Sequence, residues 1–267
     1  MLTVGSLFSG IGGFDLGLER AGVQVKWQVE IDPYCLKVLE KHWPHVRRYT
    51  DIKTVDWSGV EPVDLVCGGF PCQPVSCAGK RKGTSDERWL WPEFARCLRL
   101  LRPRYVILEN VPGLLTANDG RACAEVLDDL SASGYEFEWQ IISAAAVGAP
   151  HLRRRLWIVA YAASICRYER LLMGSNGWSN EAEQVGMGCQ NVSDTERQRC
   201  EEQWSTRAFE TGTIMTDSWW SSEPNVGRVA YGVPARAHRL RGLGNAVVPQ
   251  VVEWIGRQIL QAEESLV

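Results

Sequence analysis

The sequence lacks several features that would each assign it to another class of protein. No run approaches the roughly eighteen apolar residues of a membrane span, so we expect no membrane association. The first residues do not follow the pattern of a secretory signal peptide, so we expect a cytoplasmic protein. The nine cysteines have no repeated spacing, which favours free thiols in a reducing compartment over a disulfide framework. The formal net charge is −3, so a site for a polyanion such as nucleic acid must be a local patch.

What is present indicates a soluble globular α/β protein. A chain of 267 residues is long enough for one large domain, alone or with a small insertion, and an apolar fraction of 45% is ordinary for such proteins. Residues 1–160 alternate short apolar runs with helical patterns, which is typical of βαβ units and a parallel sheet. The expected strands cover Leu2–Leu7, Val25–Val29, Val63–Cys67, Tyr105–Leu108, Phe137–Ile142 and Leu156–Ala160.

Helical patterns fall between these strands and again near the end of the chain. Asp32 followed by Pro33 predicts the start of a helix, because aspartate is a favoured N-cap and proline suits the first helical position. A stripe of valine and isoleucine at residues 244–260 predicts one last helix, with Pro249 in its first turn. Further helices are expected near residues 14–21, from Pro92, and near residues 121–132.

The regular pattern is lost after residue 160. We therefore expect one α/β domain, formed by residues 1–160 and 229–267, interrupted by a small irregular insertion at residues 161–228. Residues 161–218 contain five arginines, no lysine and nine acidic residues, a formal charge of −4. Four tryptophans, Trp178, Trp204, Trp219 and Trp220, fit either the core of this small region or stacking on nucleic-acid bases.

Two features after the first strands suggest a ligand site, although each has an ordinary structural alternative. The segment Phe8-Ser9-Gly10-Ile11-Gly12-Gly13 joins the first strand to the first helix, and glycines there let a ligand approach a helix N-terminus. A tight strand–helix turn explains the same glycines without a ligand. Glu30, after the second strand, stands where a carboxylate often holds ribose hydroxyls, and Asp51 follows the third strand-like run as an acceptor for an adenine amine. Either acid alone also fits a solvated loop.

Cys72 is the residue that most suggests catalysis. It follows Gly68-Gly69-Phe70-Pro71 at the end of an apolar strand. A thiol on such a turn is exposed, lies beside backbone N–H groups and is available as a nucleophile. The other eight cysteines do not follow a turn of this kind and fit buried structural positions better.

Together with four further segments, this cysteine makes the chain resemble the cytosine-C5 DNA methyltransferase family. The resemblance covers roughly residues 1–160 and 229–267, and only His151, where the family usually has glutamine, departs from the local pattern. It implies a doubly wound, mixed, mostly parallel sheet of the class I methyltransferase type, with residues 161–228 as a reduced target-recognition region. The five segments, in family order, are Phe8–Gly13, Gly69–Gln73, Glu109–Gly113, Arg153–Arg155 and Gly244–Val248.

The resemblance implies transfer of a methyl group to C5 of a cytosine that is flipped out of duplex DNA. Because C5 is weakly nucleophilic, a thiolate, here Cys72, must first add to C6 and make an enamine. Glu109 is then implied at N3 and the exocyclic amine, Arg155 at O2, and Arg153 at a phosphate or the thiolate, where guanidinium charge stabilises the transition state. By themselves, Glu109 also fits a helix-capping acid, and the arginine run fits a solvated or phosphate-binding face.

The implied methyl donor is S-adenosylmethionine, and no metal is expected. Phe8 is implied at the adenine, Glu30 at the ribose and Asp51 at the adenine amine. The full implied cofactor set is Phe8, Gly10, Ile11, Gly12, Glu30, Ile31, Asp51, Ile52, Pro71, Asn245 and Ala246.

Double-stranded DNA is the implied partner. Residues 73–88 form a polar, basic loop that we expect to close over the flipped base, although an ordinary exposed loop has the same composition. The expected DNA-binding residues are Gln73, Ser76, Lys80, Arg81, Lys82, Arg236 and Arg239.

Two other functions stay open at this point. A related branch of the superfamily methylates tRNA, and a short recognition region suits that substrate. A catalytically silent DNA-binding subunit is the second alternative, and the intact set of Cys72, Glu109, Arg153 and Arg155 argues against it. For the leading function we expect a monomeric bacterial or phage-encoded enzyme, with a cognate restriction endonuclease as a candidate partner.

Overall fold

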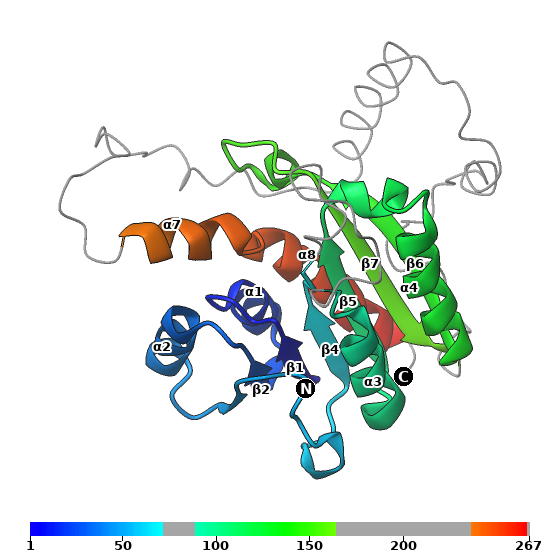
Figure 1. Ribbon diagram of the computed structural model, residues 1–267, viewed down its shortest axis with the longest axis horizontal. Coiled ribbons are helices and arrows are strands. Elements are labelled where there is room, and N and C mark those ends of the chain that lie inside the picture. Colours follow the sequence, from blue (N-terminus) through cyan, green and yellow to red (C-terminus); the bar gives the residue numbers. More distant parts are fainter. Residues whose placement is uncertain (72–88, 164–235, 266–267) are drawn as a thin grey trace.

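The computed structural model describes residues 1–71, 89–163 and 236–265. They contain a seven-stranded sheet with the order β3-β2-β1-β4-β5-β7-β6 (Figure 1). The strands are β1 (Thr3–Leu7), β2 (Gln24–Val29), β3 (Arg47–Tyr49), β4 (Leu65–Gly68), β5 (Tyr105–Asn110), β6 (Tyr135–Ile142) and β7 (Arg155–Ala162).

The sheet is mixed and mostly parallel. β1 pairs in parallel with β2 and β4, and the β2–β3 and β4–β5 pairs are parallel as well. β7 lies antiparallel between β5 and β6. The first strand is therefore interior, and later strands extend the sheet on both sides, which is the doubly wound arrangement. The prediction of a mixed, mostly parallel α/β sheet is confirmed.

The central strands are buried on both faces, which explains why they are continuous apolar runs without alternation. In β4, Leu65 and Cys67 face one core cluster and Val66 faces the other. In β5, Ile107 and Leu108 divide in the same way. The cluster that contains Leu65 also receives side chains from α1 and α8, and the other receives them from α3 and α4.

The helices cover both faces of the sheet, with α3 and α4 in front and α8 behind in the view of Figure 1. The Asp32–Pro33 start signal is confirmed, because the Asp32 carboxylate accepts hydrogen bonds from the N–H groups of Tyr34 and Cys35. The helices are α1 (Gly13–Ala21), α2 (Pro33–His42), α3 (Trp91–Leu101), α4 (Arg121–Ala132), α7 (Arg236–Asn245) and α8 (Pro249–Ser265), with short 3-10 turns η1 (Trp57–Gly59), η4 (Pro112–Thr116) and η5 (Ala144–Val147). Within the described ranges, none of the helices is long and apolar enough to cross a bilayer.

The C-terminal segment differs from the single helix expected over residues 244–260. α7 ends at Asn245, and α8 begins at Pro249, so Val247 and Val248 lie in the connection between two helices. Pro249 is at the start of a helix as expected, and the stripe from Val251 to Ile259 is buried in the core. Proline disfavours helical geometry in the residue before it, which explains why the valines do not continue the helix backwards.

Close approach of α1 to α8 depends on a glycine. A Cβ atom added to Gly17 would lie 2.5 Å from the carbonyl oxygen of Pro249 and from the Cβ of Val252. The C-terminal helix therefore packs directly on the helix that follows the glycine-rich turn.

Asp15 is a carboxyl buried between α1 and the sheet, with 1% of its surface exposed. It accepts hydrogen bonds from Gln28 Nε2 at 2.8 Å and Ser6 Oγ at 3.2 Å. Burial nevertheless raises its pKa to about 6, because the few hydrogen bonds do not offset the lost hydration.

We predict that this carboxyl makes folding less favourable as the pH rises. The folded state holds a proton on Asp15 up to about pH 6, whereas the unfolded chain releases it near pH 4, so the free energy of unfolding falls over this interval. The loss amounts to roughly 3 kcal/mol at neutral pH. Asp15→Asn has no proton to release and so avoids this loss. In urea unfolding, the stability of the variant relative to the wild type should increase between pH 4 and about pH 6 and stay constant at higher pH. Parallel pH profiles for the two proteins would contradict the assignment.

Candidate active site

The predicted segments lie at the carboxyl ends of four neighbouring parallel strands. Residues 8–12 follow β1, Glu30 follows β2, residues 69–71 follow β4, and Glu109 is near the end of β5. Because these strands are adjacent and parallel, their carboxyl ends share one edge of the sheet, which is where ligands bind in open α/β sheets.

The turn after β1 has the backbone shape of a ligand loop. Phe8, Gly10 and Gly12 have positive φ angles of 52°, 56° and 87°. A Cβ atom on Gly12 would also lie 2.3 Å from the ring of Trp43, so no larger residue fits there. Gly12 is the N-cap of α1 and makes no side-chain cap hydrogen bond, which leaves N–H groups of the first turn for a polar ligand group. These features fit a polar or anionic ligand group such as a carboxylate.

Glu30 fixes the shape of this turn. One carboxylate oxygen accepts the Gly10 N–H at 2.7 Å, and the other accepts the Asp32 N–H at 2.7 Å. Each carboxylate oxygen has a second lone pair, so the same group still has acceptor capacity for ribose hydroxyls. The neighbouring Ile31 is 68% exposed, which suits an apolar surface for a planar ligand group.

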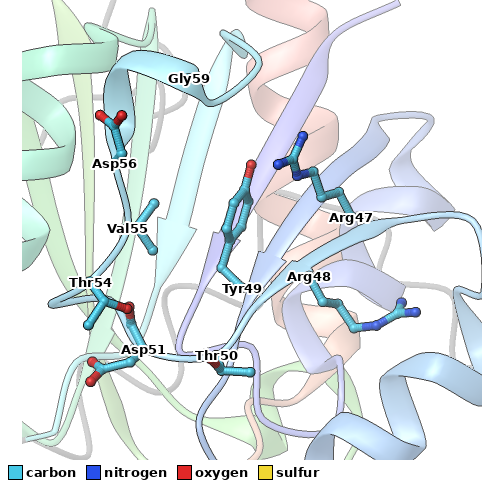
Figure 2. A pocket seen from close by; sticks show the side chains of 9 residues that line it. All are labelled: Arg47, Arg48, Tyr49, Thr50, Asp51, Thr54, Val55, Asp56 and Gly59. Carbon is cyan, nitrogen blue, oxygen red and sulfur yellow. The ribbon is translucent and has the colours of Figure 1, made fainter.

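Asp51 lines an open cavity of about 490 Å³ beside β3, the strand at the edge of the sheet. Figure 2 shows the Arg47 guanidinium near the Tyr49 ring, 5.1 Å from its centroid, with Asp56 across the cavity. Of the predicted cofactor residues, only Asp51 is in this lining, and the adjacent Ile52 is buried. The large cavity therefore extends away from the predicted catalytic residues.

Glu109 is the buried carboxyl of the site. It is 8% exposed, and its Oε1 lies 3.0 Å from Arg155 Nε. Burial raises its pKa to about 7, although the guanidinium groups of Arg155 and Arg153 act in the opposite direction. A small cavity of about 10 Å³ beside the carboxyl is lined by the two arginines, Arg153 and Arg155, and by the apolar residues Ile142, Ala144, Trp157, Val248 and Val251. The loss of hydration on burial outweighs the two guanidinium groups, which lets this carboxyl carry a proton near neutral pH.

The strand ends bring Glu109 close to the segment that precedes Cys72. A Cβ atom on Gly69 would lie 2.9 Å from Glu109 Oε2, so the glycine allows this approach. Asn110, which is buried, donates its amide N–H to the Phe70 carbonyl at 3.2 Å and accepts the Val111 N–H. Sequence reasoning assigned no role to Asn110. Its only signal was its place beside Glu109 at a strand end.

Arg153 makes a contact different from the one expected. Its guanidinium donates to the carbonyl oxygens of Gly244, at 3.0 Å, and Ala246, at 2.5 Å. Its φ of 31° is unusual for a residue other than glycine. Asn245 is exposed and Ala246 is half-buried, so the structure brings the last predicted segment to the arginine pair.

The remaining predicted residues divide into two groups. Arg239 is exposed on α7, as a phosphate contact requires. The residues from Cys72 to Lys82 lie outside the described part of the chain, and so does the side chain of Arg236. These predictions are Cys72, Gln73, Ser76, Lys80, Arg81 and Lys82, together with Arg236.

Four of the other cysteines can be judged from their surroundings. Cys35, Cys67, Cys97 and Cys123 are free and buried. Burial raises the pKa of each thiol, to about 12 for Cys35 and about 11 for Cys123, which disfavours the reactive thiolate. These four cysteines therefore fit the structural role expected for them. Across the described ranges, no group of histidine, cysteine and acidic residues is arranged to hold a metal ion.

The strand order, the glycine turn after β1 and the acidic residue after β2 define a fold of the class I methyltransferase type. The S. pombe Dnmt2 methyltransferase shares this fold, with a TM-score of 0.59 over 100% of this chain and 99% of that one, at 18% sequence identity. The family described as C-5 cytosine-specific DNA methylase matches residues 2–222, and the chain belongs to that family. The family assignment made from the motifs is confirmed.

Two curated relatives show how far the similarity extends. The Type II methyltransferase M.Eco47II of Escherichia coli is 40% identical over 162 residues, which cover 59% of this chain and 39% of that protein. The Type II methyltransferase M1.HphI of Haemophilus parahaemolyticus is 37% identical over 165 residues, which cover 58% of this chain and 44% of that protein. The matched part of this chain therefore spans less than half the length of these relatives.

We predict that Arg155→Gln raises the pKa of Glu109 further above 7. The variant loses the guanidinium that favours the carboxylate, while the apolar walls that disfavour it stay in place, so the increase should be about one unit or more. Carbon-13 NMR of glutamate-labelled protein measures the titration directly. Arg257→Gln, which removes an arginine paired with Glu253 on α8, is the matched control and should leave Glu109 unchanged. An unaltered titration in Arg155→Gln would mean that the ion pair has no influence.

Proposed function

We propose that this protein is a DNA (cytosine-5)-methyltransferase. The observation that carries the proposal is the Glu109–Arg155 pair, held beside Gly69 at the strand end that leads to Cys72. Membership of the cytosine-specific family supplies the substrate class. The relatives named above are Type II methyltransferases, so we extend the proposal to modification of DNA beside a restriction endonuclease.

The chemistry proposed for these residues begins with the Cys72 thiolate. Its sulfur forms a bond to C6 of a cytosine flipped out of the duplex, while the proton on Glu109 is donated to N3 and the second carboxyl oxygen accepts from the exocyclic amine. The Arg155 guanidinium donates to O2 and offsets the charge that accumulates on the ring. C5 then gains the methyl group. Solvent takes the C5 proton as the C6–S bond breaks by β-elimination, which restores the thiolate, and N3 returns its proton to Glu109.

S-adenosylmethionine, when bound, supplies the methyl group. We propose that the turn at residues 8–12 holds its amino-acid side, that Glu30 accepts from the ribose hydroxyls, and that Asp51 and Ile52 bind the adenine. Asn245 and Ala246 close the pocket from the C-terminal side. The remaining members proposed for this pocket are Ile31 and Pro71.

The proposed partner is duplex DNA, bound by a monomer inside a bacterial cell. Residues 1–160 and 229–267 form the catalytic domain in this proposal, and residues 161–228 read the target sequence. Arg239 contacts a phosphate, as do the basic residues of the loop at 73–88.

The first test is methyl incorporation from labelled S-adenosylmethionine into duplex DNA and into tRNA. We predict incorporation into DNA, and a loss of at least about a thousandfold in Cys72→Ser, because a hydroxyl is a far weaker nucleophile than a thiolate. Binding of S-adenosylhomocysteine should be retained. Cys77→Ser, five residues away, is the matched control and should stay active. Incorporation into tRNA alone, or full activity of Cys72→Ser, would overturn the function or the mechanism respectively.

The second test concerns the proton on Glu109. Because N3 receives its proton from an acid with a pKa of about 7, we predict that kcat falls as the pH rises above 7. Glu109→Gln keeps the size of the side chain without a transferable proton and should lose about a hundredfold or more. Its residual activity should no longer fall above pH 7. A variant that keeps the wild-type pH profile would assign the titration to another group.

A further inference from the structure

The Arg153 side chain joins two parts of the protein that are far apart in sequence. Its two terminal nitrogens donate to Gly244 and Ala246, which are 91 and 93 residues away. Gly244 is in the last turn of α7 and Ala246 follows the helix, and we call residues 242–248, which end before α8, the α7–α8 junction. A planar guanidinium can bridge two carbonyl oxygens in this way, whereas a single ammonium group cannot match the same geometry.

The acceptors belong to the C-terminal end of a helix. α7 ends at Asn245, so the carbonyl oxygens of its last turn have no partner further along the helix and carry the negative end of its dipole. A cation that donates to them satisfies these oxygens and complements the dipole. Arg153, which lies two residues before the start of β7, therefore acts as the cap of α7.

The α7–α8 junction lies directly on the glycine turn that we assign to the cofactor. A Cβ atom added to Gly13 would meet Val247 at 2.9 Å, and one added to Gly242 would lie 3.0 Å from the Ile11 side chain. A shift of the junction therefore moves the wall that faces residues 11–13. The half-buried Ala246 and the exposed Asn245, both proposed for the cofactor pocket, move with it.

Arg153 and Arg155 are separated by one residue and have different partners. Arg155 pairs with Glu109, while Arg153 is partly desolvated at the junction, and burial lowers its pKa. Turning this guanidinium toward a DNA phosphate would break one or both of its hydrogen bonds to the backbone carbonyls. The positive φ of Arg153 is a local strain, and these two hydrogen bonds help to offset it.

We propose that Arg153 is a positioning residue that fastens the α7–α8 junction onto the glycine turn and so sets the affinity for the adenosyl cofactor, rather than a contact to DNA. The inference deepens the proposed function and rests on it. It predicts that loss of Arg153 weakens cofactor binding in the absence of DNA.

The test uses S-adenosylhomocysteine, which binds without reacting, and titration calorimetry of wild type, Arg153→Lys and Arg153→Gln. We expect the Kd to increase by about tenfold in Arg153→Gln and by less in Arg153→Lys, whose ammonium keeps the charge but lacks the planar fork that reaches both carbonyls. In DNA binding without cofactor, both variants should keep the wild-type dependence on salt concentration, because no phosphate contact is removed. Hydrogen exchange should be faster at residues 244–252 in both variants, and this readout needs no ligand.

Arg239→Gln, on the exposed side of α7, is the matched control with the opposite pattern. It should keep the cofactor Kd and reduce the slope of log K against log salt concentration by about one. If Arg153→Gln behaves like Arg239→Gln, with a reduced slope and an unchanged cofactor Kd, the positioning role is wrong. Unchanged exchange at the junction would overturn it as well. Failure of the wild type itself to bind S-adenosylhomocysteine would instead overturn the proposed function.

Discussion

The site depends on one electrostatic constraint, the burial of Glu109 in an ion pair with Arg155, with the Arg153 guanidinium also nearby. Without Arg155, a carboxyl that is 8% exposed would be strongly biased toward its neutral form, and with full hydration it would be ionised at neutral pH. The balance between these influences places its pKa at about 7. A carboxyl in this range can both hold and release a proton under cellular conditions, which is what acid catalysis at a ring nitrogen requires.

The sheet supplies the rigid frame for this balance. Glu109 is paired with Trp157 across the β5–β7 ladder, and Asn110 is paired with Leu156. The antiparallel β7 brings Arg155 to the same edge as the ends of the parallel strands. The antiparallel direction of β7 therefore places Arg155 beside Glu109, although the two residues are 46 positions apart in the sequence. Asn110 then holds the carbonyl of Phe70, so the segment before Cys72 is tied to the strand that carries the acid.

Much of this arrangement could be predicted from the sequence, because its signals are local. The central strands are continuous apolar runs, α2 has an Asp–Pro start, and the motif residues follow strands whose carboxyl ends must meet. α7 was not predicted, since Arg236–Asn245 has no apolar stripe and the side chains of Arg239 and Arg241 are exposed. It is held by tertiary contacts instead, such as the stacking of His238 on Tyr34. The contacts of Arg153 and Asn110 also join distant segments, so no local pattern indicates them.

In the proposed reaction, one side of α7 lies beside the cofactor turn and the other side faces the solvent from which DNA would bind. Gly242 and His238 face the glycine turn and Tyr34 at the start of α2, while Arg239 is exposed. The whole chain carries a net charge of −3, so attraction to DNA must come from such local cations. A helix that packs on the cofactor turn and presents arginine to solvent cannot move toward a phosphate without disturbing that turn. In the proposed reaction, affinity for the two substrates would therefore be coupled through α7, and the Arg153 guanidinium that caps its C-terminus would limit how far the helix moves.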